Sequence, residues 1–475
     1  MSHIYKSKFR IASGFLLASA MVVSGCSGGA DGGKTGFKPL GKDEKAALKV
    51  AFFDEQAFDA MYGNVFRAKY PGIEVEVVST REASTGQDPV QAMKKLIDEQ
   101  KPDVTVLSQE QYASLSAEGL LYDLEPVVKQ DKFDIENVSP SVVDALRTLG
   151  GGKLNGLAPS FDTQAVYYNK DLFAKYGIPL PADKMSWEQF LQLAQRFPAD
   201  GQGDDRIYGL FQDEQVTNPF DLASMMGASK GLTYVNPDTG AVTIDTKEWK
   251  QVVQAVADSY KSKKVFQPEG PSQDNNGKMA IRIGPDTFKA HKFLGGKAAM
   301  MLQNTMTKDM FDISAKMGGD TKPFEWGVVT IPVDPSNPDV TSRFSMNQIY
   351  AVTAQAANVS AAWELVKFIN GAGDGKSSGG MMIGGGTSSR LTGSKTKDGK
   401  SLEAFYTLKP NPALLTQKYP QGFASAFNTI TAAEMKAVLG GSKTVDDALK
   451  AMQTQGQEAY DKAKLAEQKA SSDGK

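Results

Sequence analysis

Two short segments of the chain carry residue types that could do chemistry. Residues 25–29, Gly-Cys-Ser-Gly-Gly, match the Gly-x-Ser-x-Gly turn on which hydrolases expose a nucleophilic serine. That turn needs a strand before the serine and a helix after it, and neither pattern is present here. Residues 370–377 come within one residue of a phosphate-binding loop, but Asn370 stands where its first glycine belongs. We therefore interpret both segments as loops without catalytic or phosphate-binding roles.

The chain has few residues suited to metal binding or to covalent catalysis. Its 475 residues include one cysteine, Cys26, and two histidines, of which His3 lies at the extreme N-terminus. A disulfide within the chain, a thiolate cluster and a His-rich zinc site are therefore excluded. The 53 basic and 55 acidic residues give a net charge of −2, which indicates no basic face for nucleic acid. We expect no metal, no cofactor and no nucleic-acid partner.

The N-terminus gives the most specific local signal. A basic start precedes an apolar run, Ile11 to Val23, which is too short for a membrane span of roughly 20 residues but typical of a signal peptide. The run ends in Val-Ser-Gly-Cys26, which resembles the bacterial lipobox, whose cysteine is lipidated after cleavage. We expect residues 1–25 to be a lipoprotein signal peptide and residues 26–45 a lipidated, flexible tether. A plain secretory signal with an incidental cysteine is the alternative.

From residue 48 onward, strand patterns alternate with helix patterns. Leu48–Phe53 is an apolar run suited to a buried strand, and Ile73–Val77 alternates with period two. Ser186-Trp187-Glu188-Gln189 is a capping box, which predicts a helix start. This order predicts an α/β fold in which sheets are flanked by helices. Because 475 residues exceed the usual size of one domain, we expect two lobes.

Seven segments, in order along the chain, resemble the family 1 extracellular solute-binding proteins of bacterial ABC importers, a maltose-binding-protein-like family. The most characteristic is Gly156–Tyr176, GLAPSFDTQAVYYNKDLFAKY, where the chain of that family passes the substrate cleft. The other six are Lys101–Val104, Glu118–Leu124, Met185–Phe190, Gly296–Met301, Trp326–Pro332 and Ala361–Phe368. The resemblance runs from about residue 46 to residue 462, and the lipobox agrees with it.

This resemblance implies a two-lobed periplasmic-binding-protein fold of the class II type, with mixed sheets flanked by helices and a cleft between the lobes. It places lobe one at residues 46–161 plus 328–370, and lobe two at residues 165–326 plus 371–475. It also implies a monomer, held at the extracytoplasmic face of the bacterial cell membrane, that captures a solute by hinge closure. The solute, a mono- or oligosaccharide, would pass unchanged to the permease subunits of an ABC transporter, so the protein would not be an enzyme.

Candidate solute-binding residues are those near the carboxyl ends of strands and at the chain crossings, where open α/β sheets place their ligand sites. Their carboxylate, amide and hydroxyl groups suit a polyol. They are Asp54, Glu55, Gln109, Glu110, Phe161, Asp162, Gln164, Asn304, Thr305 and Asn347. Where the resembled family carries a tryptophan and an Asp-Arg pair, this chain has Leu107, Glu110 and Gln111, so the aromatic platform is missing there.

Other interpretations stay open. The same fold could bind a polyamine, an iron chelate or a phosphorylated compound, or act as a ligand sensor, although no basic cluster favours an anion. An extracellular glycosidase would need two carboxylates about 5 to 9.5 Å apart, for which Asp54 and Glu110 are the available pair. The tryptophans at 187, 249, 326 and 363 have spacings that indicate packing more than stacking on a sugar.

Overall fold

The computed structural model describes residues 37–41, 44–85, 88–198, 201, 203–213, 216–268, 288, 290–317, 323–371 and 386–473. The expected signal peptide, Cys26 and most of the expected tether lie outside these ranges. So does the glycine-rich segment after Gly371. Residues Phe37 to Lys475 group into one compact unit. Within the described ranges, no helix has both the length and the apolar character that crossing a bilayer requires.

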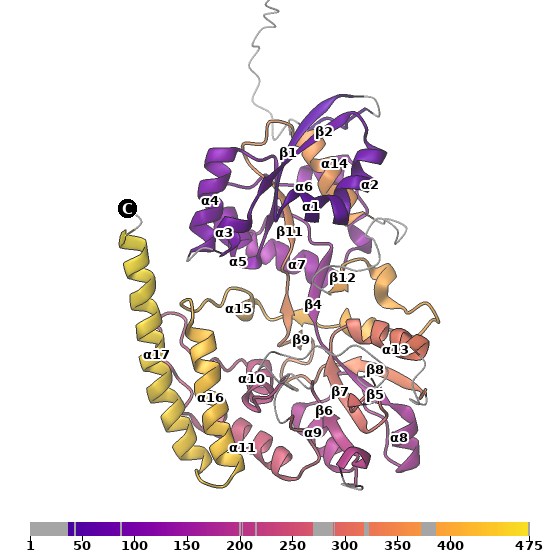
Figure 1. The fold of residues 1–475 in the computed structure, drawn as a ribbon, viewed down its shortest axis with the longest axis vertical. Helices are drawn as coiled ribbons and strands as arrows, with labels where there is room; N and C mark the ends of the chain where they lie inside the picture. Colours follow the sequence, from indigo (N-terminus) through magenta and orange to yellow (C-terminus); the bar gives the residue numbers. More distant parts are fainter. Residues whose placement is uncertain are drawn as a thin grey trace, which may run out of the picture. The chain divides into compact units, whose positions relative to one another are not determined.

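The first large sheet has the strand order β11-β3-β1-β2 (Figure 1). Its strands are β1 (Ala46–Phe52), β2 (Ile73–Ser79), β3 (Val104–Leu107) and β11 (Ile349–Val352). The first three run parallel, and β11 pairs antiparallel with β3. The associated helices are α1 (Glu55–Phe58), η1 (Asp59–Gly63), α2 (Asn64–Lys69), α3 (Arg81–Thr85), α4 (Pro89–Gln100), α5 (Gln109–Ala117), α6 (Glu125–Gln130), η2 (Ile135–Asn137), α7 (Pro140–Leu149) and α14 (Val359–Asn370). Parallel pairing requires such crossover connections, as the alternating sequence pattern predicts.

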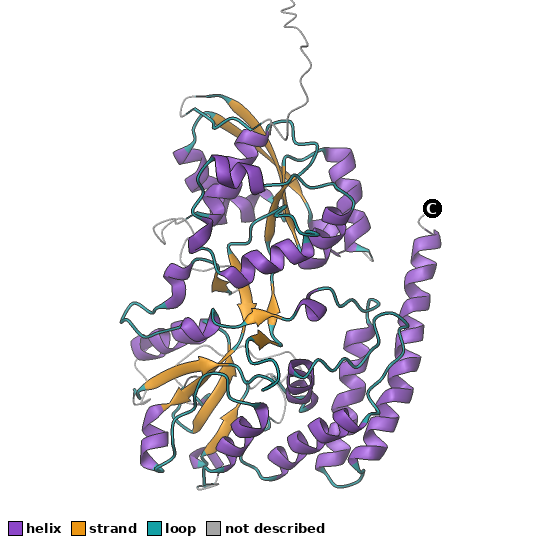
Figure 2. Ribbon diagram, turned by 180° about the vertical axis from the view of Figure 1, so that it is seen from behind, coloured by secondary structure: helices purple, strands orange, loops and turns teal. Residues whose placement is uncertain are grey.

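The second large sheet has the strand order β6-β7-β5-β8. Its strands are β5 (Ala165–Asn169), β6 (Tyr208–Phe211), β7 (Ala298–Gln303) and β8 (Trp326–Thr330). Its helices are α8 (Lys170–Lys175), α9 (Trp187–Gln195), η3 (Gly203–Asp205), α10 (Phe220–Ser229), α11 (Lys247–Lys261), α13 (Met306–Met317), α16 (Phe423–Leu439) and α17 (Val445–Asp473). Ser186 and Gln189 form the predicted capping box at the start of α9. Helices flank both sheets (Figure 2).

Short strands form where the chain crosses between the two large sheets. β4 (Ser160–Thr163) pairs with β10 (Phe344–Ser345) and with β12 (Thr387–Ser388). β9 (Val340–Thr341) pairs with β13 (Lys409–Pro410), which precedes α15 (Pro412–Leu415). The turns η4 (Leu391–Ser394) and η5 (Glu403–Phe405) lie between β12 and β13. These crossings bring residues that are far apart in sequence to one place.

Each large sheet has a hydrophobic core of its own, so the core in which a residue packs shows which lobe the chain is in at that point. Trp363 is buried in the first core, and Trp187 and Trp249 are buried in the second, in agreement with the predicted packing role. β8 pairs with β5, and Val333 still packs in the second core, whereas Met346 packs in the first. The return to the first lobe therefore lies between these two residues, later than the expected position 328, because β8 completes the second sheet.

Candidate functional site

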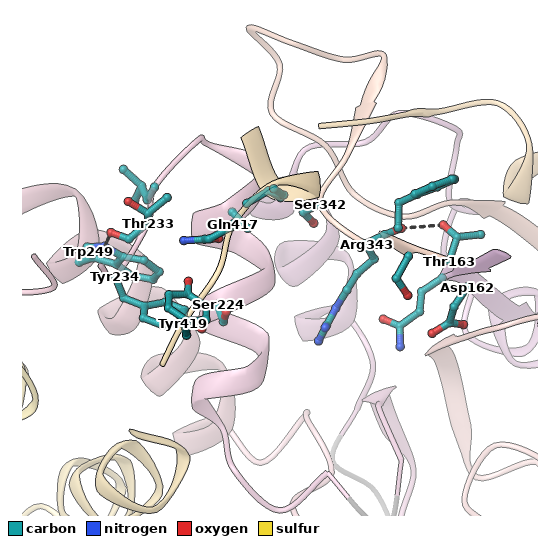
Figure 3. Close-up of a pocket in the computed structure, with 16 residues that line it drawn as sticks. Asp162, Thr163, Ser224, Thr233, Tyr234, Trp249, Ser342, Arg343, Gln417 and Tyr419 are labelled. Carbon is teal, nitrogen blue, oxygen red and sulfur yellow. Dashed lines mark hydrogen bonds between the residues drawn. The ribbon is translucent and has the colours of Figure 1, made fainter. Parts of the chain in front are cut away.

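A cavity of about 280 Å³ lies between the helices of the second lobe and the crossing segments (Figure 3). It is lined by Asp162, Thr163, Gln164, Ser224, Ala228, Leu232, Thr233, Tyr234, Trp249, Ser342, Arg343, Phe344, Ser345, Leu414, Gln417 and Tyr419. A second cavity of about 380 Å³ is lined by Gln164, Gln212, Asp213, Val216, Asp221, Met225, Leu302, Gln303 and Arg343. Gln164 and Arg343 line both, so the two cavities adjoin. Small-molecule sites usually measure about 300 to 1,000 Å³.

Three side-chain atoms in the first cavity are buried and lack a hydrogen-bond partner among the described residues. They are Gln164 Oε1, Ser342 Oγ and Gln417 Nε2. Buried polar atoms in folded proteins almost always have a partner, so three unpaired atoms in one cavity favour a ligand that completes them. One is an acceptor, one is a donor, and the hydroxyl can be either. This combination complements a molecule rich in hydroxyl groups.

The Arg343 side chain lies between two groups of cavity residues. Figure 3 shows it extending between Asp162 and Thr163 on one side and Tyr234 and Tyr419 on the other. Its backbone is held by Thr163, whose Oγ1 donates to Arg343 O at 2.8 Å. The guanidinium forms no ion pair with any residue in the described ranges, so its five N–H donors are available to a solute.

Three carboxylates line the same two cavities as this guanidinium. Burial raises the pKa of Asp162, while Asn304 and the Arg343 charge lower it. The Asp162 carboxylate reaches solvent through the cavity, but protein on its other sides partly desolvates it. Burial also raises the pKa of Asp221, against the lowering effect of Arg343. Asp213 accepts a hydrogen bond from Gln303 Nε2 at 2.8 Å. Among the described residues that line the paired cavities, three acidic side chains face one basic side chain.

Aromatic side chains form the opposite wall of the first cavity. The Tyr234 ring stacks on Tyr419 with centroids 5.3 Å apart and on Phe427 at 4.9 Å, both at an interplanar angle of 17°. Trp249 is buried beneath them, and its indole N–H donates to Thr233 O at 3.3 Å. These stacked rings form a rigid aromatic cluster, of which Tyr234 and Tyr419 line the cavity.

The structure brings two sequence-predicted residues, Asp162 and Gln164, into the cavity wall. Asn304 lies close enough to Asp162 to lower its pKa. Thr305 is buried and its hydroxyl pairs with that of Thr387 at 3.2 Å. Phe161 is 2% exposed, with its ring 5.3 Å from that of Phe344. As a correction to the sequence expectation, Phe161 and Thr305 contribute to the interior, because both face away from solvent.

The five candidates near the first sheet line neither cavity. Asp54 caps α1, accepting from the Ala57 N–H at 2.8 Å, and pairs with Arg81 at 2.6 Å. These two contacts lower the pKa of its carboxyl. Glu55 is exposed in the first turn of α1, and Asn347 is exposed before β11. Gln109 and Glu110 contact the crossing segments instead.

The carboxylate pair considered for glycoside hydrolysis is also engaged elsewhere. Asp54 pairs with Arg81, and Glu110 lies 3.3 Å from Lys418 Nζ. Neither Asp54 nor Glu110 lines either of the two cavities. Among the described residues, no group of three or more His, Cys, Asp and Glu side chains is arranged to hold a metal ion.

Sequence reasoning missed several of the residues that shape the cavity, namely Arg343, Tyr234, Asp221, Gln417 and Tyr419. Arg343 lies four residues before Asn347, which was itself a candidate, but nothing in the local sequence singles out the arginine. Tyr234 and Tyr419 meet only in the folded protein. No local pattern relates them.

A profile of the bacterial extracellular solute-binding protein family matches residues 41–376. The chain belongs to this family. A curated binding protein of Brucella abortus (strain 2308) is 25% identical over 234 residues, which are 49% of this chain and 48% of that protein. The match to this curated relative thus spans about half its length. The family predicted from the sequence is confirmed.

Solved structures show the fold of this solute-binding protein. A sugar transporter from Rhizobium etli, in an open conformation, is 22% identical with a TM-score of 0.55, covering 86% of this chain and 99% of that one. The sugar-binding protein MalE from Xanthomonas citri is 15% identical with a TM-score of 0.59, covering 88% and 98%. The predicted two-lobed α/β fold, with sheets flanked by helices, is therefore confirmed.

Proposed function

We propose that this solute-binding protein captures a neutral, polyhydroxylated solute, a mono- or oligosaccharide or a related polyol, in the cavity beside Arg343. The observation that carries the proposal is the concentration of unpaired polar atoms in that cavity. Among the described residues, Gln164 Oε1, Ser342 Oγ and Gln417 Nε2 have no hydrogen-bond partner, and the nearby Arg343 guanidinium forms no ion pair. Sugar hydroxyls are both donors and acceptors, so one solute can satisfy all four groups.

The shape and charge of the cavity support the same class of solute. Tyr234 and Tyr419 line the cavity, and aromatic side chains of this kind pack against the C–H face of a sugar ring. The excess of carboxylates opposes an anionic or phosphorylated solute. The names of two structural neighbours, a sugar transporter and a sugar-binding protein, point in the same direction.

A polyamine is the second candidate, because Asp162, Asp213 and Asp221 together outnumber the one guanidinium between them. A flexible polycation would pair with these carboxylates but would leave the aromatic wall unused. It would also bring positive charge toward Arg343. These two mismatches favour the neutral solute.

We further propose that the protein is a monomer that delivers its solute, chemically unchanged, to the permease subunits of an ABC transporter. Hinge closure would follow if the solute binds the closed arrangement of the lobes more tightly than the open one. The lipobox supports lipidation at Cys26 and attachment to the extracytoplasmic face of the cell membrane. The extracellular family to which the chain belongs is consistent with that location.

A thermal-unfolding panel tests the proposed solute class. D-glucose, maltose, maltotriose and D-mannitol would be compared with spermidine, ferric citrate and inorganic phosphate. A ligand at 100 times its dissociation constant stabilises the folded state by about 2.7 kcal/mol. We expect a shift with a neutral sugar or polyol, and chromatography should recover that solute intact. A shift with spermidine alone would establish the second candidate, and a shift with phosphate alone would refute both.

A further inference from the structure

The first residue of α5 ties two crossing segments together. Gln109 Nε2 donates to Leu415 O at 2.8 Å, and Gln109 Oε1 accepts from the Met346 N–H at 3.3 Å. Leu415 and Met346 belong to different crossings, one after β13 and one after β10. One side-chain amide therefore links both crossings to the first lobe, using its donor on one and its acceptor on the other.

The start of α5 is itself firmly held. Ser108 and Gln111 form a capping box, with the Ser108 N–H donating to Gln111 Oε1 at 2.9 Å. Gln111 Nε2 donates to Pro89 O at 3.0 Å, which links the cap to the start of α4. A capped, buttressed helix start holds the Gln109 side chain in a fixed position. Because the Gln109 side chain is fixed, its two hydrogen bonds can hold Leu415 and Met346 in defined positions.

A second contact follows one residue later. The Glu110 carboxylate lies 3.3 Å from Lys418 Nζ, and both side chains are more than half exposed. An exposed ion pair of this kind adds little stability by itself. Lys418, however, lies between Gln417 and Tyr419, which both line the cavity. The pair therefore acts on the part of the chain that carries two cavity residues.

On the crossing that contains Met346, a contact with α5 also lies next to residues that line the cavity. Arg343 and Ser345 line the cavity just before Met346, whose N–H is bound by Gln109. Neither Gln109 nor Glu110 lines the cavity itself. We propose that Gln109 and Glu110 form a latch through which the first lobe positions both crossing segments of the cavity wall. They are positioning residues, and solute affinity depends on them without direct contact. The claim about solute affinity rests on the proposed function, whereas the claim that Gln109 and Glu110 order the crossing segments does not.

Hydrogen exchange in the full chain, without added solute, tests the ordering of the wall. Gln109→Ala removes one hydrogen bond to each crossing, and each is worth about 1 kcal/mol. We expect amides in 341–347 and 411–420 to exchange about fivefold faster, since 1.4 kcal/mol corresponds to a factor of ten and each segment loses about 1 kcal/mol. Gln100→Ala, an exposed glutamine on the first lobe, is the matched control and should leave both segments unchanged.

Gln109→Glu tests the two hydrogen bonds of Gln109 separately, and it distinguishes their loss from general misfolding. It keeps the acceptor for Met346 and removes the donor to Leu415, so exchange should rise in 411–420 far more than in 341–347. Unchanged exchange at both segments in Gln109→Ala would overturn the latch. An equal rise throughout the chain in both variants would also overturn it, because that pattern indicates global destabilisation.

A charge swap tests the affinity part. Glu110→Lys and Lys418→Glu would each be titrated with the panel member, maltotriose or D-mannitol, that stabilises the wild type more. Each single variant should weaken binding by up to about fivefold, the range of exposed pairs, and the double variant should restore it. Unaltered single variants, or a double variant no better than either, would contradict the coupling. If no neutral sugar or polyol of the panel binds, the proposed function fails, and the exchange experiment still decides whether the latch exists.

Discussion

Replacing Arg343 by methionine should weaken solute binding strongly while leaving the fold intact. The guanidinium lines both cavities and forms no ion pair with a described residue, so its removal breaks no direct contact and takes from the unliganded protein only the longer-range charge that lowers the pKa of Asp162 and Asp221. Surface substitutions that break no such contact usually change the free energy of unfolding by less than about 0.5 kcal/mol. A hydrogen bond to a charged group contributes about 1.5 to 3 kcal/mol. The expected loss is therefore about 10-fold to 150-fold in the dissociation constant.

Isothermal titration with the sugar or polyol found in the panel measures this loss. Arg196→Met is the matched control, because Arg196 is an exposed arginine of the second lobe beyond the end of α9. Both variants remove one positive charge, so a change common to both would report net charge and not contact. The reasoning is refuted if Arg343→Met binds within twofold of wild type, or if Arg196→Met loses as much affinity.

The remaining predictions concern the cavity acid, a buried histidine and the anchor. Burial raises the pKa of Asp221, so Asp221→Asn should unfold at higher urea concentration at pH 7, and this gain should vanish toward pH 4, where the wild-type group takes up a proton. Burial lowers the pKa of His291 to about 4, so wild type should lose up to about 3 kcal/mol between pH 6.5 and about 4 as the unfolded chain takes up a proton, and His291→Phe should show a flatter urea-denaturation profile there. Cys26→Ala should release the protein from the membrane fraction with an unchanged dissociation constant, and retention in the membrane would contradict lipidation.

Local patterns in the sequence predict several of the elements, because the forces that form them act over a few residues. The apolar run Leu48–Phe53 coincides with most of β1, and the Ser186 capping box begins α9. The apolar run and the capping box are each formed by residues that are close together in the sequence. The boundary of the first lobe was harder to place, because the packing of Val333 and Met346 in different cores depends on strand pairing far away in the sequence.

The site is only partly predictable for the same reason. Asp162 and Gln164 could be identified because they lie on β4 or directly after it, in the crossing segment that the sequence marks most clearly. Asp54 fitted the same rule, but its carboxylate is used by the helix cap and by Arg81. Arg343 was missed because its neighbours in the cavity come from four separate parts of the chain. Sequence position identifies which segments approach the cavity, whereas the folded structure decides which side chains face it.

A crystal structure of the protein with the bound sugar or polyol tests the central claim most directly. We expect the solute between Arg343 and the stacked Tyr234 and Tyr419 rings, with hydroxyl groups within hydrogen-bond distance of Gln164 and Gln417. The latch predicts that Gln109 keeps its contacts to the crossing segments in that complex without touching the solute. A solute bound elsewhere, with Gln164 and Gln417 still unpaired, would contradict the account.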